Sequence, residues 1–156
     1  MGRRLPITPG NSAVGPTGGV RKAHPGTSER IVVSIHPLAV VSPGARLGAG
    51  VTVGPFAIVE DGAQLGDFCT VASGAVIKGG VTAGCHNEFH EHAVIGGAPQ
   101  HAARPAETGR VVIGDHNVFR EHVTIHRAMK PDGVTTVGHR NYVMAGGHFG
   151  HDVLVG

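Results

Sequence analysis

Apolar residues recur at every sixth position along most of the chain. The run starts at Ile35 and keeps one phase to the end, although it lapses twice on the way. Its members are Ile35, Val41, Leu47, Val53, Val59, Leu65, Val71, Ile77, Ala83, Phe89, Ile95, Ile113, Phe119, Ile125, Val137, Val143, Phe149 and Val155. A period of six fits neither an α-helix, which repeats every 3.6 residues, nor a long alternating strand.

Small side chains follow four residues after most of these apolar positions, as at Ala39, Ala57 and Ala75. We therefore predict a solenoid in which each hexad forms one short strand and one corner, and three hexads close a triangular turn. The apolar and the small side chains point into the prism, and successive turns pair as parallel strands about 4.8 Å apart. The predicted fold is an all-β parallel β-helix.

The two lapses fall at about residues 99–109 and 127–136, and the hexad phase resumes unchanged after each of them. A regular prism with two loops leaving its corners explains this pattern. Loops on a rigid scaffold often carry the functional residues. We expect these two loops to contribute to a site.

Residues 1–30 are rich in Gly, Pro, Ser and Thr, and they contain no apolar run long enough for a signal peptide or a membrane span. We expect this extension to be disordered and residues 31–156 to form the β-helix domain. The formal net charge is only +2, which argues against nucleic-acid binding. Cys69 and Cys85 show no metal-ligand spacing and no export signal, which indicates the reducing cytoplasm.

Histidines gather in the second half, where ten of the twelve lie from His86 onward. Such a cluster can be a set of solvated corners, a metal site or an acid–base site. The hexad phase predicts that His126 and His151 lie on one prism face, one turn apart, with His148 at the adjoining corner. An open prism face lacks walls for a pocket, so a neighbouring subunit has to supply them and a closed oligomer is expected.

Two histidine motifs carry a resemblance to a known family. The motifs Val-Thr-Ile-His126-Arg127 and His148-Phe-Gly-His151-Asp152 resemble those of the acyl-carrier-protein-dependent UDP-N-acetylglucosamine O-acyltransferases of lipid A synthesis. The opening Ile35-His-Pro-Leu-Ala is similar too, although other hexapeptide-repeat transferases share it. The resemblance runs from about residue 35 to 156.

This resemblance implies a left-handed β-helix that assembles as a homotrimer with active sites between subunits. It implies transfer of a (3-hydroxy)acyl group from acyl carrier protein to the 3-hydroxyl of UDP-N-acetylglucosamine, the first step of lipid A synthesis, without a cofactor or a metal. His151 corresponds to the general base. His126, His148, Gln100 and Asp152 are expected to bind substrate.

The chain departs from the family pattern in two places. Where the family has Gln-Asp followed by a lysine in the first loop, this chain has Gln100-His101-Ala102-Ala103, so an acidic and a basic contact are missing. The chain also stops at Gly156, whereas the family continues with further coils and a helical domain. We expect a truncated product whose last turn frays and which gains activity only when the missing coils are restored.

Two other functions fit the sequence. A zinc enzyme of the carbonic anhydrase kind would use three histidines across a subunit interface, and the Cys85-His-Asn-Glu-Phe-His-Glu-His92 cluster would favour it. A non-catalytic trimeric scaffold is the third possibility.

Overall fold

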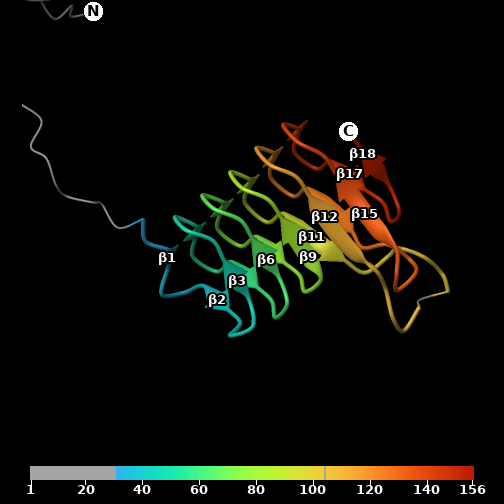
Figure 1. Cartoon of the computed structure of the whole chain (residues 1–156), viewed down its shortest axis with the longest axis horizontal. Coiled ribbons are helices and arrows are strands. Elements are labelled where there is room, and N and C mark those ends of the chain that lie inside the picture. Colours follow the sequence, from blue (N-terminus) through green and yellow to red (C-terminus); the bar gives the residue numbers. More distant parts are fainter. Residues whose placement is uncertain (1–30, 104) are drawn as a thin grey trace, which may run out of the picture.

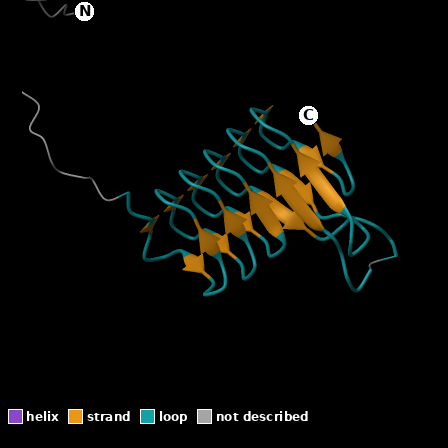
Figure 2. Ribbon diagram, in the orientation of Figure 1, coloured by secondary structure: helices purple, strands orange, loops and turns teal. Residues whose placement is uncertain are grey.

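The structure is a computed structural model that describes residues 31–103 and 105–156. The extension for which we predict disorder, residues 1–30, lies outside the described residues. Within the described part, every regular element is a strand, and eighteen strands form three parallel sheets of six (Figure 1; Figure 2). The predicted parallel β-helix is confirmed.

Each coil contributes one strand to each sheet. The first sheet contains β1 (Ser34–Ile35), β4 (Thr52–Val53), β7 (Thr70–Val71), β10 (Glu88–Phe89), β13 (Val118–Phe119) and β16 (Tyr142–Val143). The second contains β2 (Val40–Val41), β5 (Ile58–Val59), β8 (Val76–Ile77), β11 (Val94–Gly97), β14 (Thr124–His126) and β17 (His148–Phe149). The third contains β3 (Arg46–Leu47), β6 (Gln64–Leu65), β9 (Val81–Ala83), β12 (Arg110–Ile113), β15 (Val134–Val137) and β18 (Leu154–Val155).

The hexad residues fill the prism, as the period predicts. Phe89, Phe119 and Ile125 are fully buried, and the rings of Phe89 and Phe119 stack in successive coils with their centroids 5.4 Å apart. Small residues such as Ala57 and Ala93 occupy the narrow corners and are also fully buried. Burying this apolar surface between neighbouring coils is the main source of stability, because no coil has a core of its own.

Two insertions interrupt the 18-residue spacing between paired strands. The spacing rises to 30 residues between Asn87 and Asn117 and to 24 residues between Asn117 and Asn141. The first insertion is the loop of residues 98–109 between β11 and β12, and the second is the loop of residues 127–133 between β14 and β15. The second loop is three residues shorter than the lapse in the sequence pattern, because residues 134–136 already pair with β12.

Non-glycine residues in the left-handed backbone region mark many of the corners. Their φ angles lie between 55° and 61°. They are Phe56, Phe68, His86, His92, His116, His122, Arg140 and Asp152. This conformation is uncommon outside glycine, and Asn, Asp and His adopt it more readily than most other residues. The four histidines in this set therefore suit these corners because of their backbone conformation.

A candidate acyl-transfer site

The two loops leave the prism at the same corner, between the second and the third sheet, in successive coils (Figure 1). They contact each other at their bases: Gly109 N–H donates to the Ala128 carbonyl at 2.9 Å, and Arg110 N–H donates to the Gly133 carbonyl at 3.2 Å. A Cβ on Gly109 would collide with the Gly133 carbonyl oxygen, so glycine is required for this approach. The loops therefore form one joined structure beside the corner.

His126 and His148 lie next to each other on the second sheet. Thr124 of β14 pairs with His148 of β17, and the rings of His126 and His148 meet edge to face with their centroids 4.8 Å apart. The Thr124 hydroxyl and His148 Nδ1 form a hydrogen bond of 2.7 Å, which fixes the orientation of that ring. Our prediction that His148 sits at the adjoining corner is therefore wrong.

The buried member of the pair is His126, which is only 7% exposed. Its Nδ1 has no hydrogen-bond partner among the described residues. Burial lowers the pKa of His126, and the nearby imidazoles of His148 and His151 lower it further. Both effects favour the neutral form of His126, and its Nδ1 can bind a ligand. Gly97 makes room for the ring, since a Cβ there would lie 3.0 Å from His126 Cδ2.

His151 occupies the corner after β17, and not the sheet face on which the hexad phase placed it. The predicted position on the sheet face and the observed position at the corner are one residue apart along the chain. In strands of only two residues, a shift of one residue moves a side chain from the sheet face to the corner. His151 Nδ1 lies 2.7 Å from Asp152 Oδ2. This hydrogen bond is the main reason why the pKa of Asp152 lies below its usual value, and the Met129 N–H and the charges of His151 and Lys130 add to the effect.

The ionised Asp152 carboxylate can only accept hydrogen bonds, so the proton of neutral His151 resides on Nδ1. Nε2 then carries a free lone pair. The backbone N–H of Met129, in the second loop, approaches both Asp152 oxygens at 3.2 and 3.3 Å. Asp152, which was expected to bind substrate, contacts His151 Nδ1 and the Met129 N–H in this structure.

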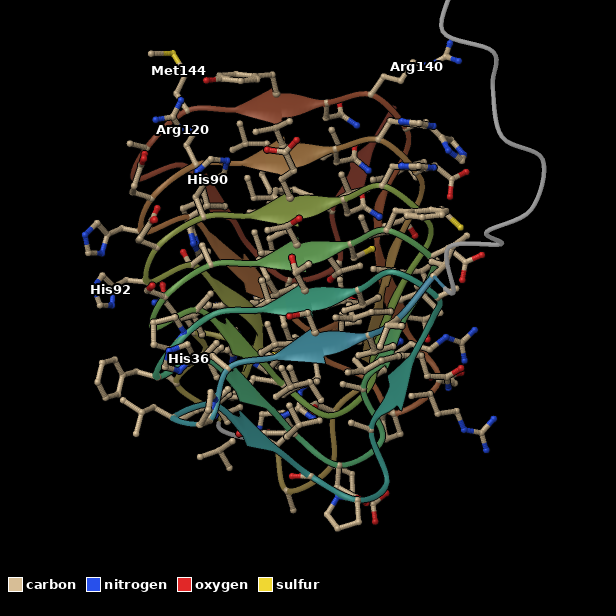
Figure 3. All side chains as sticks on the ribbon, turned by 90° about the vertical axis from the view of Figure 1, so that its left-hand side faces the viewer. His36, His90, His92, Arg120, Arg140 and Met144 are labelled. Carbon is tan, nitrogen blue, oxygen red and sulfur yellow. The ribbon has the colours of Figure 1, made fainter. Side chains whose placement is uncertain are left out.

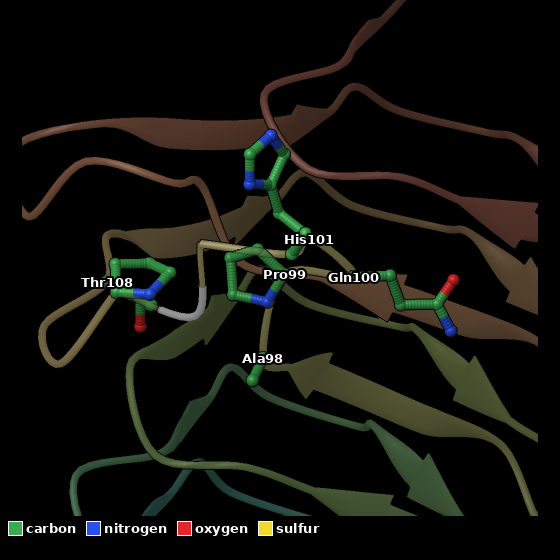
Figure 4. A pocket seen from close by; sticks show the side chains of 7 residues that line it. Ala98, Pro99, Gln100, His101 and Thr108 are labelled. Carbon is green, nitrogen blue, oxygen red and sulfur yellow. The ribbon is translucent and has the colours of Figure 1, made fainter.

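The first loop brings another imidazole to this corner. The rings of His101 and His151 meet edge to face with their centroids 6.0 Å apart. The Ala103 N–H donates to His101 Nδ1 at 3.1 Å. Gln100 and His101 help to line a hollow of about 560 Å³. Their side chains leave the loop in different directions (Figure 4). Its other lining residues are Ala98, Pro99, Ala102, Pro105 and Thr108.

Four other histidines form stacks on the outer corners. His86 and His116 are parallel with ring centroids 4.7 Å apart, and His92 and His122 stack at 5.3 Å. All four have positive φ angles and exposed side chains. These histidines cap the corners of successive coils and do not converge on the site.

The group of side chains best arranged for a metal, among the described residues, is His90 with Glu91 and Glu121. His90 and Arg120 lie one above the other along one edge of the prism (Figure 3). Two nitrogens of Arg120 donate to Glu121 at 2.8 and 3.2 Å, and this pairing is the main cause that lowers the pKa of Glu121 to about 2. The guanidinium competes with any cation at this position. The group supplies one imidazole from this chain, and the carbonic anhydrase hypothesis takes its three histidines from two subunits.

Part of this sequence is similar to known proteins. Residues 44–79 match the family of bacterial transferase hexapeptide (six repeats). The chain is 52% identical over 123 residues to the acyl-[acyl-carrier-protein]–UDP-N-acetylglucosamine O-acyltransferase of Burkholderia ambifaria, across 78% of this chain and 47% of that protein. It thus spans about half the length of the curated relatives it matches.

Solved structures give the same result. The UDP-N-acetylglucosamine O-acyltransferase of Moraxella catarrhalis superimposes with a TM-score of 0.75 and 36% identity, over 78% of this chain and 48% of that one. The Bacteroides fragilis UDP-N-acetylglucosamine acyltransferase superimposes with a TM-score of 0.72 and 36% identity, over 74% of this chain and 46% of that one. The fold is the left-handed parallel β-helix, and the chain is similar, over about half of their length, to the UDP-N-acetylglucosamine O-acyltransferases.

Proposed function

We propose that this protein transfers an acyl group, of the (3-hydroxy)acyl class, from acyl carrier protein to the 3-hydroxyl of UDP-N-acetylglucosamine, with His151 as general base. The observation that carries the proposal is the 2.7 Å hydrogen bond between His151 Nδ1 and the Asp152 carboxylate. It leaves Nε2 free to accept a proton, and an imidazole is basic enough near neutral pH to do so.

The chemistry is a single acyl transfer. His151 Nε2 removes the proton of the sugar hydroxyl as its oxygen attacks the thioester carbonyl. The carbon–sulfur bond then breaks, an ester forms, and the imidazolium returns the proton to the carrier-protein thiolate. Asp152 stabilises the imidazolium through the hydrogen bond to Nδ1, so neither a metal nor a covalent intermediate is needed.

His126, His148 and Gln100 are proposed to bind the substrate. The free Nδ1 of buried His126 favours a role in hydrogen-bonding an uncharged or anionic group, because a buried polar atom without a partner is costly. His148 is exposed beside it, and its ring is held by Thr124. Gln100 lines the hollow of the first loop, which is large enough for part of a nucleotide sugar.

A closed homotrimer is proposed as the active assembly. His148 is exposed and a third of the His151 side chain is open, so the site needs a second wall that a neighbouring copy can supply. The described residues contain no helix that could cross a membrane. We propose that the enzyme works in the cytoplasm, where its carrier-protein donor would be available.

The direct test is an acyl-transfer assay with acyl carrier protein thioesters and UDP-N-acetylglucosamine. It is run on the 156-residue chain and on a chimera in which residues 31–156 replace the matching segment of the Burkholderia ambifaria relative. We expect ester formation by the chimera. A folded chimera without transfer would overturn the proposal. Stoichiometric zinc with carbon dioxide hydration would favour the metal enzyme, and neither activity would favour the scaffold.

A further inference from the structure

A buried hydroxyl lies behind the His151 corner. Thr135 of β15 is fully buried, and its Oγ1 accepts a hydrogen bond of 2.9 Å from the Asp152 N–H. In the two preceding coils the same inward position is occupied by Val111 and Val81. Valine has the shape of threonine without its hydroxyl. The fold therefore accepts an aliphatic residue at this position, and the hydroxyl in this coil needs another explanation.

The explanation lies in how the corners are tied together. Asp152 has φ of +61°, and in each of the other seven non-glycine residues with positive φ the backbone N–H donates to a backbone carbonyl of the preceding coil. His92 donates to Ser73 in this way, and His122 to Glu91. In the coil that precedes Asp152, the second loop takes the place of the regular corner that would supply this carbonyl. The Thr135 hydroxyl takes the place of the missing carbonyl.

The hydrogen bond between the Asp152 N–H and Thr135 Oγ1 holds the backbone that carries His151 and Asp152. The Asp152 carboxylate meets His151 Nδ1 on one side and the Met129 N–H on the other. Asp152 makes both contacts from the left-handed conformation, which carries a cost even for aspartate. Without an acceptor for its N–H, the turn can relax and the carboxylate can leave His151.

We propose that Thr135 is a positioning residue for acyl transfer: its hydroxyl fixes the Asp152 turn and thereby keeps the proton of neutral His151 on Nδ1. This role rests on the proposed function of His151. The Met129 N–H is the second anchor of the same carboxylate. Neither group touches the reacting atoms.

The test uses the whole chain with ¹⁵N-labelled histidine. Two-bond ¹H–¹⁵N correlation spectra, recorded above the titration range of the imidazoles, show which ring nitrogen of His151 carries the proton. We expect Nδ1 to be protonated in the unmodified chain and in Thr135→Ser. In Thr135→Val the signals should move towards those of Asp152→Asn, which lacks the carboxylate. Thr136→Val changes the neighbouring residue of β15 in the same way and should leave the spectrum unchanged.

Two further measurements sharpen the outcome. In the chimera, Thr135→Val should lower kcat on the order of tenfold with little change in KM, as expected when a catalytic group is misplaced, and Thr135→Ser should restore it. If Thr135→Val does not fold, Thr135→Cys is used, because the thiol is similar in size and a weak acceptor.

An unchanged His151 spectrum in a folded Thr135→Val or Thr135→Cys chain would overturn the positioning role, whatever the activity. Absence of acyl transfer by the unmodified chimera would instead overturn the proposed function. The spectra are recorded without substrate, so the two failures are distinguishable.

Discussion

At the scale of single residues, the site combines two kinds of imidazole. His126 is buried and its pKa is lowered, whereas His151 is partly open and paired with a carboxylate. Burial penalises the charged form of His126. The proposed site thus combines a buried imidazole at the end of β14 with a partly open imidazole at the corner after β17.

His151→Ala should lower kcat in the chimera by at least about a hundredfold, the range expected when a general base is lost. Asp152→Asn should lower kcat as well, because the amide no longer favours the Nδ1 proton. His148→Ala should act mainly on KM. The assay is steady-state acyl transfer with purified, folded variants. Near-normal turnover of His151→Ala, with loss of activity in His148→Ala, would show that His148 is the base.

The neutral state of His126 predicts how stability depends on pH. Its folded-state pKa is lower than the unfolded value of about 6.5, so the unfolded chain binds more protons at mildly acidic pH. The stability that neutral His126 contributes is therefore fully present above about pH 7 and is lost as the pH drops below 6.5 towards the folded-state pKa.

His126→Gln should make the urea midpoint less sensitive to a change from pH 7.5 to 5.5, because the variant has no imidazole to charge at this position. The same substitution at exposed His36 controls for removal of a surface histidine. Equal pH dependence in the unmodified chain and in His126→Gln would contradict the prediction.

At the scale of elements, columns of like residues tie one coil to the next. Asn87, Asn117 and Asn141 form a ladder in which both the backbone N–H and the side-chain amide of one asparagine donate to the Oδ1 of the asparagine before it. Asn87 and Asn117 are fully buried. The ladder crosses the coils that carry both insertions, so it holds the strand register where the spacing changes.

Asn117→Ala should destabilise the chain by about 2 kcal/mol or more, since each polar group left unsatisfied costs about 1–3 kcal/mol. The substitution leaves the Asn141 N–H and the Gly138 carbonyl without their partners, whereas Asn87 Oδ1 still accepts from the backbone N–H of residue 117. Urea unfolding measures the loss. Thr52→Val, which removes the exposed hydrogen bond to Thr70, is the control and should change stability by less than about 1 kcal/mol. Similar losses in both variants would show that the ladder is not special.

The strands could be predicted from the sequence because the hexad period is a local property of side chains that face one core. The insertions followed from the lapses in that period. The side on which His148 and His151 lie could not, since a shift of one residue at the end of a two-residue strand changes face into corner. The contacts of His101 with His151 and of Met129 with Asp152 depend on loop conformations that have no period. Thr135 is a polar residue at a position that is aliphatic in the two preceding coils, and the sequence contains this signal.

At the scale of the whole molecule, stability passes from coil to coil. In the central coils the core residues, such as Val71 and Ile95, are buried, whereas Val143, Phe149 and Val155 of the last coil are only partly covered. A coil with one neighbour gains about half of the interface energy available to a coil with two. His148 and His151 thus lie in or next to a strand of a coil that has one neighbour among the described residues.

Hydrogen exchange of the 156-residue chain should reflect this gradient. We expect amides of β16–β18 to exchange faster than those of β7–β12, since their opening requires loss of only one interface. Segment-resolved mass spectrometry of a non-aggregated sample measures it. Equal protection of both regions would show that another contact covers the last coil. Adding the remaining coils of a relative, as in the chimera, should remove the difference.

The parallel pairing of β14 with β17 gives the site a fixed scale along the prism axis. His148 lies one strand spacing, about 4.8 Å, beyond the coil of His126, and a coil can move a side chain along this axis only in whole steps of that size. The first loop, residues 98–109, is not restricted to these steps and can place His101 at any intermediate height along the axis. Transferring a histidine from one coil to the next would therefore suit a substrate longer or shorter by about one step, and finer adjustments fall to the loops.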